Sequence, residues 1–331
     1  MRGNICPRCL SELGKEYIEE GAHRIADGDV VCEKCWWSLL KDEEEPSLKR
    51  TGVFYHEICG KEAYKTLAMS VEEGFESLVK AGFFEKPNVI LIESEPASEE
   101  ELLKVHTHRW IEEVKKTRWW RVSPYSTGGM VSSTEKVLSG EIDNALVFVG
   151  VGGHHAHPDS AWGGCFFNMM AVAIRIAREK GLGRRFAIID TDTHHADGTR
   201  DIFLHDEDVL HICFCGYGES LGRTKICLSH GLSDDEEVEI LEREVPWRVG
   251  EFKPDLIYWV CGLDTHRDSY GTRRLTENCY PRLAKVIRDM ADKICDGKLV
   301  VKTGCNAPAY VSEFVMPRIL SILSGIGFSL S

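Results

Sequence analysis

The residues best suited to chemistry are crowded into one short stretch, residues 190–198, which reads DTDTHHADG. It holds three carboxylates and two imidazoles, and carboxylates are rarely buried unless they are paired. The stretch follows an apolar run, so residues 186–192 are expected to form a buried strand. Alternation along that strand would put Asp190, Asp192 and His194 on one face. An Asp and a His on a shared face can bind one divalent metal, so the pattern predicts a metal site.

The elements that must position these side chains are apolar runs separated by helical segments. Near-continuous apolar strands alternating with helices are typical of a parallel sheet covered on both faces, so the fold class predicted is α/β with three layers. Ligand sites in such sheets gather beyond the carboxyl ends of the strands. Strands are expected over residues 52–56, 88–93, 145–151, 186–192, 209–215, 256–262 and 299–303, and helices over 61–81, 98–116, 128–140 and 165–180.

Two further histidines and a third carboxylate follow strand ends in this scheme. His154 and His155 come after the run 145–151, and Asp264 comes after the run 256–262. Asp264 would complete an Asp-His-Asp set that leaves a position open for water, which is what a catalytic zinc requires.

The first forty residues carry two Cys-x-x-Cys pairs that are separated by 22 residues. Two such pairs can supply four thiolates to one tetrahedral zinc ion, so residues 1–40 are predicted to be a zinc ribbon whose folding depends on metal. The ligands would be Cys6, Cys9, Cys32 and Cys35. Residues 41–49 are charged and contain a proline, so we expect a linker there and a catalytic domain over 50–331.

Composition limits the range of functions. The formal net charge of −13 argues against general nucleic-acid binding, because a phosphate-binding surface needs an excess of Lys and Arg. No apolar run approaches the length of a membrane span, and the start of the sequence lacks a signal-peptide core, so we expect no membrane association and a cytoplasmic protein. Thirteen cysteines without a secretory signal fit reduced thiols and metal ligation.

Taken together, three motifs resemble the histone deacetylase and acetylpolyamine amidohydrolase family over residues 50–331. They are GGHHA over 152–156, followed by Asp159, Gly163, Cys165 and Asn168; DTDTHHADG over 190–198; and the stretch from Gly262 to Thr276 that contains Asp264 and Asp268. The resemblance implies an arginase/deacetylase-like fold. It also implies that Asp192, His194 and Asp264 hold catalytic zinc, with ferrous iron as the alternative.

The same resemblance assigns the remaining site residues. His154 and His155 match the paired histidines of the family, and Asp190 and Asp197 match the carboxylates that orient them. The implied reaction is metal-assisted amide hydrolysis, in which His155 takes the proton of the attacking water and later protonates the leaving amine. His154 would act as an electrostatic partner. His195 matches a neighbour of the site that is not a ligand, so it is expected to give structural support.

The sequence departs from the family at three places. Cys305 stands where family members have a tyrosine that donates to the developing oxyanion, and a thiol is a weak donor. Loss of one oxyanion donor typically lowers turnover by about 10²- to 10³-fold. Tyr217, Tyr270 and Tyr310 are candidates to replace it. Cys305 could itself ligate metal or react, although an inert buried cysteine is the commoner case.

The other two departures concern the substrate. Gly164 replaces an aromatic residue that lines the acyl-lysine tunnel, so the tunnel is either wider or filled by Trp162. Loop 117–127 lacks the acidic residue of lysine deacetylases and offers Arg118 and Arg121. We therefore expect a substrate with an anionic group.

Two functions of different classes follow. The first is a metal-dependent amidohydrolase that acts on an acylated amine or a related small molecule, with a ribbon that docks an unidentified protein partner or stabilises the chain. The second is a catalytically impaired protein of the same fold that binds a ligand or partner, because Cys305 replaces the tyrosine. Retention of both histidine–aspartate pairs favours the enzyme. A related two-metal ureohydrolase would need further ligand-bearing motifs that the sequence lacks.

Overall fold

The computed structural model describes residues 23–24, 30–31, 48–65, 67–271, 273–305 and 307–328. Within these residues, eight strands form one sheet in the order β4-β3-β5-β10-β9-β6-β7-β8, and every neighbouring pair is parallel. The predicted α/β sheet is confirmed. Its strands are β3 (Thr51–Tyr55), β4 (Val89–Glu93), β5 (Asn144–Val147), β6 (Phe186–Asp190), β7 (Val209–Cys213), β8 (Lys225–Cys227), β9 (Leu256–Cys261) and β10 (Leu299–Thr303).

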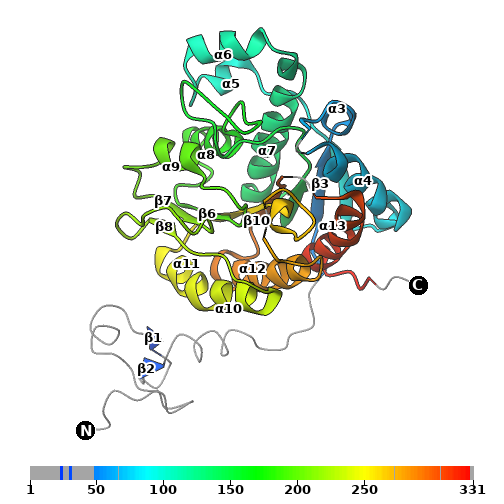
Figure 1. The fold of residues 1–331 in the computed structure, drawn as a ribbon, viewed down its shortest axis with the longest axis vertical. Helices are drawn as coiled ribbons and strands as arrows, with labels where there is room; N and C mark the ends of the chain where they lie inside the picture. The colour runs from blue at the N-terminus through cyan, green and yellow to red at the C-terminus, as the bar shows by residue number, and fades with distance from the viewer. Residues whose placement is uncertain are drawn as a thin grey trace.

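Helices cover the sheet on both sides and complete three layers (Figure 1). On one side α7 packs against α8 and against β5, and on the other α13 packs against α4, α12 and β5. The helices are α3 (Glu57–Lys61), α4 (Ala68–Lys80), α5 (Glu99–Leu102), α6 (His108–Lys115), α7 (Ser123–Leu138), α8 (Met169–Glu179), α9 (Asp197–Ile202), α10 (Asp234–Glu244), α11 (Pro246–Phe252), α12 (Cys279–Cys295) and α13 (Ala309–Ser324). Three 3₁₀ turns, η1 (Phe83–Glu85), η2 (Arg118–Arg121) and η3 (Leu263–Thr265), lie between them.

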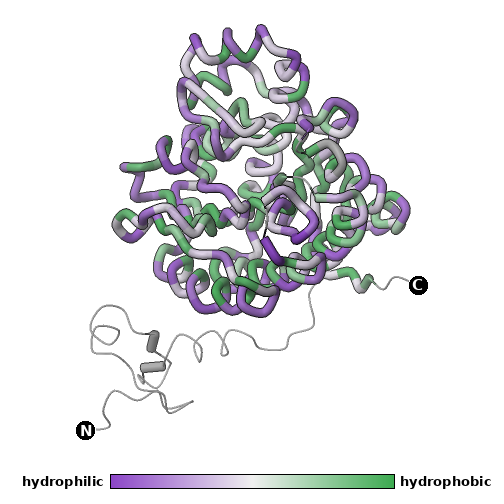
Figure 2. Tube along the Cα trace, viewed as in Figure 1, coloured by the Kyte–Doolittle hydropathy of each residue, from purple (hydrophilic) through white to green (hydrophobic). Residues whose placement is uncertain are grey.

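The core is formed by the central strands and the apolar faces of the helices, and in Figure 2 the peripheral helices alternate between hydrophilic and hydrophobic along the chain. All six residues of β9 are buried, including Tyr258 and Trp259. A buried aromatic needs a partner for its polar atom. The indole N–H of Trp259 donates to Thr191 Oγ1 at 3.0 Å, and Tyr258 Oη lies 2.7 Å from Thr134 Oγ1. The sheet therefore buries large side chains without leaving these groups unpaired.

Two predicted helices are wrong in extent because tertiary contacts interrupt them. The helix expected over 61–81 is split into α3 and α4, and between them the Tyr64 N–H donates to the Gly150 carbonyl at 2.7 Å. The helix expected over 98–116 is split into α5 and α6, and Thr107 caps the second by accepting from Trp110 N–H. Both breaks bring loop residues toward the carboxyl edge of the sheet.

At the N-terminus the structure describes only a short antiparallel pair, β1 (His23–Arg24) and β2 (Val30–Val31). Cys6, Cys9, Cys32 and Cys35 lie outside the described residues, so the zinc ribbon over 1–40 and the linker over 41–49 stay predictions. The Lys49 N–H already donates to the Ser324 carbonyl at 3.0 Å, which joins this residue to the folded body. In the described part of the chain, no helix is both long enough and apolar enough to span a membrane.

Candidate metal and catalytic centre

The candidate site lies where four adjacent central strands end. β5, β10, β9 and β6 are neighbours in the sheet, and the segments after them carry His154, Cys305, Asp264 and Asp192. Because the strands are parallel, their carboxyl ends meet at one edge. All four of these side chains are buried.

Strand β6 ends at Asp190, two residues earlier than predicted, because the motif's own carboxylates bend the chain. Asp190 Oδ1 accepts the Asp192 N–H at 3.0 Å, and Asp192 Oδ1 accepts the His194 N–H at 3.0 Å. A carboxylate that bonds the amide two residues on forms an Asx turn, which competes with strand pairing. The expected alternation on one face is therefore wrong beyond Asp190, yet consecutive turns still bring Asp192 and His194 together.

The three predicted ligands converge. His194 Nδ1 lies 3.0 Å from Asp192 Oδ1 and 3.0 Å from Asp264 Oδ2. The Oδ2 atom of Asp192 is buried without a hydrogen-bond partner among the described residues, and the buried Oδ2 atom of Asp264 faces the His194 ring. Two buried carboxylates that share one imidazole, with one of their oxygens unpaired, are costly unless a cation compensates them. The set fits zinc or ferrous iron, which accept imidazole together with carboxylate.

The electrostatics of this group agree with a cation site. Hydrogen bonds to Asp192 and Asp264 raise the pKa of His194 to about 10. Burial, together with the negative charge of Asp192, raises the pKa of Asp264 to about 7. Burial also acts to raise the pKa of Asp192, but His154 and His194 hold it well below its usual range. The carboxylates thus attract positive charge strongly.

Both predicted histidine–aspartate pairs are present in the structure. His154 Nδ1 lies 2.9 Å from Asp190 Oδ2, and His155 Nδ1 lies 2.6 Å from Asp197 Oδ1. Burial acts to lower the pKa of His154, but Asp192 and Asp190 raise it above its usual value. Burial and the charge of His154 instead lower the pKa of His155 to about 4. One ring is therefore poised to carry charge and the other to stay neutral.

Trp162 contacts both members of the His155–Asp197 pair. Its ring stacks on the His155 ring with centroids 3.7 Å apart, and its Nε1–H donates to Asp197 Oδ2 at 2.8 Å. Burial acts to raise the pKa of Asp197, but hydrogen bonds from His155 and Trp162 lower it. Trp162 consequently orients both members of the pair, a role that the sequence alone did not indicate.

Cys305 lies inside the site. Its sulfur, an Asp192 oxygen and a His154 ring nitrogen all lie within 4.8 Å of one another. The thiol lies close to Asp192 and to the Tyr270 hydroxyl, and burial beside Asp192 and Asp264 raises its pKa well above the usual value. A thiol held in this way is protonated at neutral pH and is a poor nucleophile.

Of the three candidate tyrosines, Tyr270 reaches the site. Its ring lies 5.9 Å from the His194 ring and is 46% exposed, while burial of its hydroxyl end near Cys305 raises its pKa. Tyr310 instead donates to Asp268 Oδ2 at 2.6 Å, and the Tyr217 hydroxyl accepts the His195 N–H at 2.6 Å.

The space beside Gly164 is filled by Tyr64. Gly164 has φ +78°, and a Cβ built there would lie 2.5 Å from Tyr64 Cδ1. The residue therefore has both a left-handed backbone and a ring packed against it, so a side chain at this position is strained. Trp162 lies over His155 and does not take this place. Tyr64, from a different part of the chain, therefore takes the space that a side chain at position 164 would need.

The arginines of loop 117–127 differ in their contacts. Arg121 Nη2 pairs with Glu62 Oε1 at 2.8 Å, whereas Arg118 stacks on Trp119 at 4.6 Å. Trp119 in turn lies 4.8 Å from Tyr64, ring to ring. Arg118 is exposed and forms no ion pair with any described residue. Of the two arginines, Arg118 is therefore the one whose charge is available to a ligand.

Other histidines are placed outside the ligand set. His230 bridges Glu237 Oε1 at 3.0 Å and the Asp192 carbonyl at 3.2 Å, and so supports the ligand turn. Sequence reasoning missed it, since its only signal was Glu237 seven residues on. His157 pairs with Asp201, and His266 pairs with Glu277. His195 lies beside Cys215.

Comparison with known proteins agrees with this geometry. A sequence profile described as "Histone deacetylase domain" matches residues 116–313. A "Probable deacetylase" of Archaeoglobus fulgidus is 30% identical, with 76% of this chain and 79% of that protein covered. A "Histone deacetylase-like amidohydrolase" of Pseudomonas aeruginosa is 29% identical over 84% of this chain and 87% of its own length.

The fold is also found in solved structures. The HD domain of HDA15 superimposes with a TM-score of 0.73 at 22% identity, covering 83% of this chain and 89% of the other. The sheet, the placement of the motifs at its carboxyl edge and the sequence matches point the same way. The chain belongs to the histone deacetylase domain family.

Proposed function

We propose that this protein is a metal-dependent amidohydrolase that removes an N-acyl group from an amine. The observation that carries the proposal is the convergence of Asp192, His194 and Asp264 beside the His155–Asp197 pair. A binding module has no need of a general base next to a cation site.

Asp192, His194 and Asp264 would hold zinc, with ferrous iron as the alternative. When bound, the ion supplies Lewis-acid polarisation of a carbonyl and lowers the pKa of water. The unpaired Oδ2 of Asp192 and the buried Oδ2 of Asp264 beside His194 support this assignment. The Asx turns and the His230 contact to the Asp192 carbonyl keep the ligands in position before any ion arrives.

His155 is the proposed general base. Its Nδ1–H donates to Asp197, which leaves Nε2 free to accept a proton from water and return it to the leaving amine. The low pKa of His155 keeps this nitrogen unprotonated at neutral pH. His154 is the proposed electrostatic partner: Asp190 and Asp192 raise its pKa and so favour its charged form, which would stabilise the negative charge that develops on the substrate carbonyl.

Tyr270 is the proposed oxyanion donor in place of the family tyrosine. Its hydroxyl lies at Cys305, so a donor reaches the region of position 305 from another loop. Cys305 then serves to hold that hydroxyl and does not act as nucleophile or ligand.

The proposed substrate carries an anionic group, since Arg118 is exposed and unpaired near Tyr64 and Trp119. Its acyl group and amine are to be found by screening. The N-terminal cysteines are proposed to bind structural zinc and to serve docking or stability.

The test measures metal content and turnover on the same protein variants. The full chain is purified, its zinc and iron are measured, and hydrolysis of a library of N-acyl amines is assayed, beside Asp264→Asn and the surface control Asp289→Asn. We expect Asp264→Asn to lose both the catalytic ion and hydrolysis while the control keeps both. An Asp264→Asn chain with unchanged metal content and turnover would overturn the proposal.

A further inference from the structure

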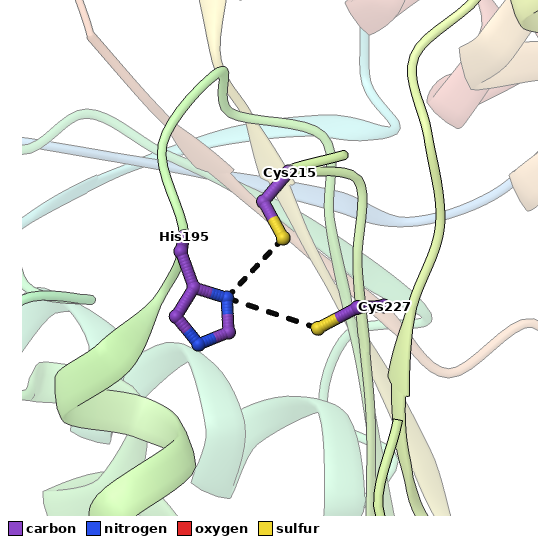
Figure 3. Close-up of side chains that lie close together, drawn as sticks. All are labelled: His195, Cys215 and Cys227. Atoms are coloured by element: carbon purple, nitrogen blue, oxygen red, sulfur yellow. Dashed lines mark hydrogen bonds between the residues drawn. The ribbon is translucent and has the colours of Figure 1, made fainter. Parts of the chain in front are cut away.

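A second cluster of metal-binding side chains lies outside the catalytic centre, at the far edge of the sheet. Figure 3 shows the His195 ring directed toward the sulfurs of Cys215 and Cys227. His195 Nδ1 lies 3.2 Å from Cys215 Sγ and 3.8 Å from Cys227 Sγ. The three ligand atoms all lie within 4.8 Å of one another. The three residues come from the loop after β6, from the loop after β7 and from the end of β8.

These separations are those of ligands around one tetrahedral ion. Zinc binds thiolate at about 2.3 Å and imidazole at about 2.0 Å, so a tetrahedral angle puts nitrogen and sulfur roughly 3.6 Å apart. The observed distances of 3.2 Å and 3.8 Å fall on either side of that value.

Cys213 offers a fourth ligand. Its sulfur lies 3.8 Å from the same nitrogen of His195. Cys213 is the last residue of β7 and pairs in register with Cys227 on β8, and Cys215, two residues beyond the strand, packs in one cluster with both. Three cysteines and one histidine are a common ligand set of structural zinc.

The surroundings suit a thiolate cluster. Three thiolates, one neutral imidazole and one Zn²⁺ carry a net charge of −1, which needs a nearby cation. Arg200, which is buried, places Nη2 2.8 Å from Cys227 Sγ. The Gly218 N–H lies 3.4 Å from Cys215 Sγ, and a Cβ at Gly218 would come within 2.5 Å of Cys227 Sγ. The loop that contains Gly218 therefore packs against the sulfurs and directs a backbone N–H at one of them.

We propose that His195, Cys213, Cys215 and Cys227 bind a structural zinc ion distinct from the catalytic one. The ion ties the edge strands β7 and β8 to the loop that carries His194, the neighbour of His195 and a proposed catalytic ligand. Its removal therefore loosens the catalytic turn as well as the sheet edge. The proposal stands whether or not the chain hydrolyses amides, because its test measures metal and thiols.

The experiment uses the full chain with Cys6, Cys9, Cys32 and Cys35 all replaced by serine, so that the N-terminal thiols bind no zinc. Zinc is counted per chain in this background and after Cys215→Ser, Cys227→Ser or the matched control Cys295→Ser, a buried thiol on α12 whose contact is a carbonyl. We expect Cys215→Ser and Cys227→Ser each to lose one zinc, and Cys295→Ser to lose none.

A second measurement needs no substitution in the cluster. The native full chain is alkylated with iodoacetamide before and after chelation, and each cysteine is followed by mass spectrometry. We expect Cys215 and Cys227 to be protected until the chelator is added, with Cys295 unchanged throughout. Equal labelling with and without chelator, or an unchanged zinc count in both variants, would overturn the proposal. So would a Cys215–Cys227 disulfide in protein freshly purified without reductant.

Discussion

The indole of Trp162 stacks on the imidazole of His155, with ring centroids 3.7 Å apart, and donates to the carboxylate that His155 also bonds. Asp197 thus divides its two oxygens between the proposed base and the tryptophan. The indole both fixes the plane of the ring and withdraws negative charge from its partner. Trp162 is therefore a positioning residue for the base.

Replacing Trp162 by Phe keeps an aromatic ring over His155 but removes the donor to Asp197. A hydrogen bond to a charged group contributes roughly 1.5–3 kcal/mol, so we expect kcat to fall about 10- to 100-fold with a smaller change in KM. The freed Asp197 charge should also raise the pKa of His155 and move the acid limb of the rate profile to higher pH. Steady-state kinetics over a pH series measure both, and an unchanged profile would count against this role.

Tyr270→Phe tests the proposed oxyanion donor. Loss of one such donor lowers turnover by about 10²- to 10³-fold, so we expect that range for kcat with the metal content unchanged. Tyr310→Phe is the matched control, because its hydroxyl bonds Asp268 outside the site. Equal activity of the two variants would remove Tyr270 from the mechanism.

Arg118→Ala tests the anionic substrate. We expect kcat/KM to fall about 5- to 10-fold for an N-acyl compound with a carboxylate and to stay unchanged for its neutral amide analogue, as suits an exposed charge pair of about 1 kcal/mol. Arg121→Ala, whose guanidinium already pairs with Glu62, serves as control. Equal losses on both substrates would show that Arg118 does not recognise charge.

His106 should make the fold sensitive to acid. Its Nδ1 bonds the His157 carbonyl at 3.0 Å and its Nε2 accepts the Asn168 N–H at 2.9 Å, so the buried ring is held neutral and its pKa falls to about 4. Between pH 6.5 and about 4 the unfolded chain binds the extra proton, so stability is full above this window and is lost as pH falls, by at most about 1.4 kcal/mol per pH unit.

Urea unfolding at about pH 7, 6 and 5 measures this dependence. His106→Gln should flatten it, and His108→Gln, at an exposed position, should leave it unchanged. A wild-type free energy of unfolding that does not fall toward pH 5 would contradict the assignment.

Much of the site could be predicted because its residues follow the ends of neighbouring parallel strands. His154, Asp192, Asp264 and Cys305 come after β5, β6, β9 and β10, which are adjacent in the sheet. Residue types at strand ends can be recognised without knowing the packing, and topology then brings them together. The resemblance to the family then assigned the ligand group and both histidine–aspartate pairs.

The rest depended on contacts that no local pattern encodes. Trp162 stacks on His155 and Tyr64 packs against Gly164 because tertiary packing sets the paths of the loops that carry them. The helix breaks before Ala68 and Thr107 have the same origin. The cluster at His195 required the pairing of β7 with the short strand β8, although Cys-x-Cys at 213–215 was a usable signal.

The most direct test of the central claim compares the wild-type chain with His155→Ala. Because His155 is the proposed base and not a ligand, the variant should keep its full metal content and lose hydrolysis of the best N-acyl substrate by about 10²- to 10⁴-fold. Metal analysis and turnover are measured on the same samples, with Cys305→Tyr alongside. A metal-loaded wild type that hydrolyses no N-acyl compound, even as Cys305→Tyr, would contradict the account and identify a binding protein built on this fold.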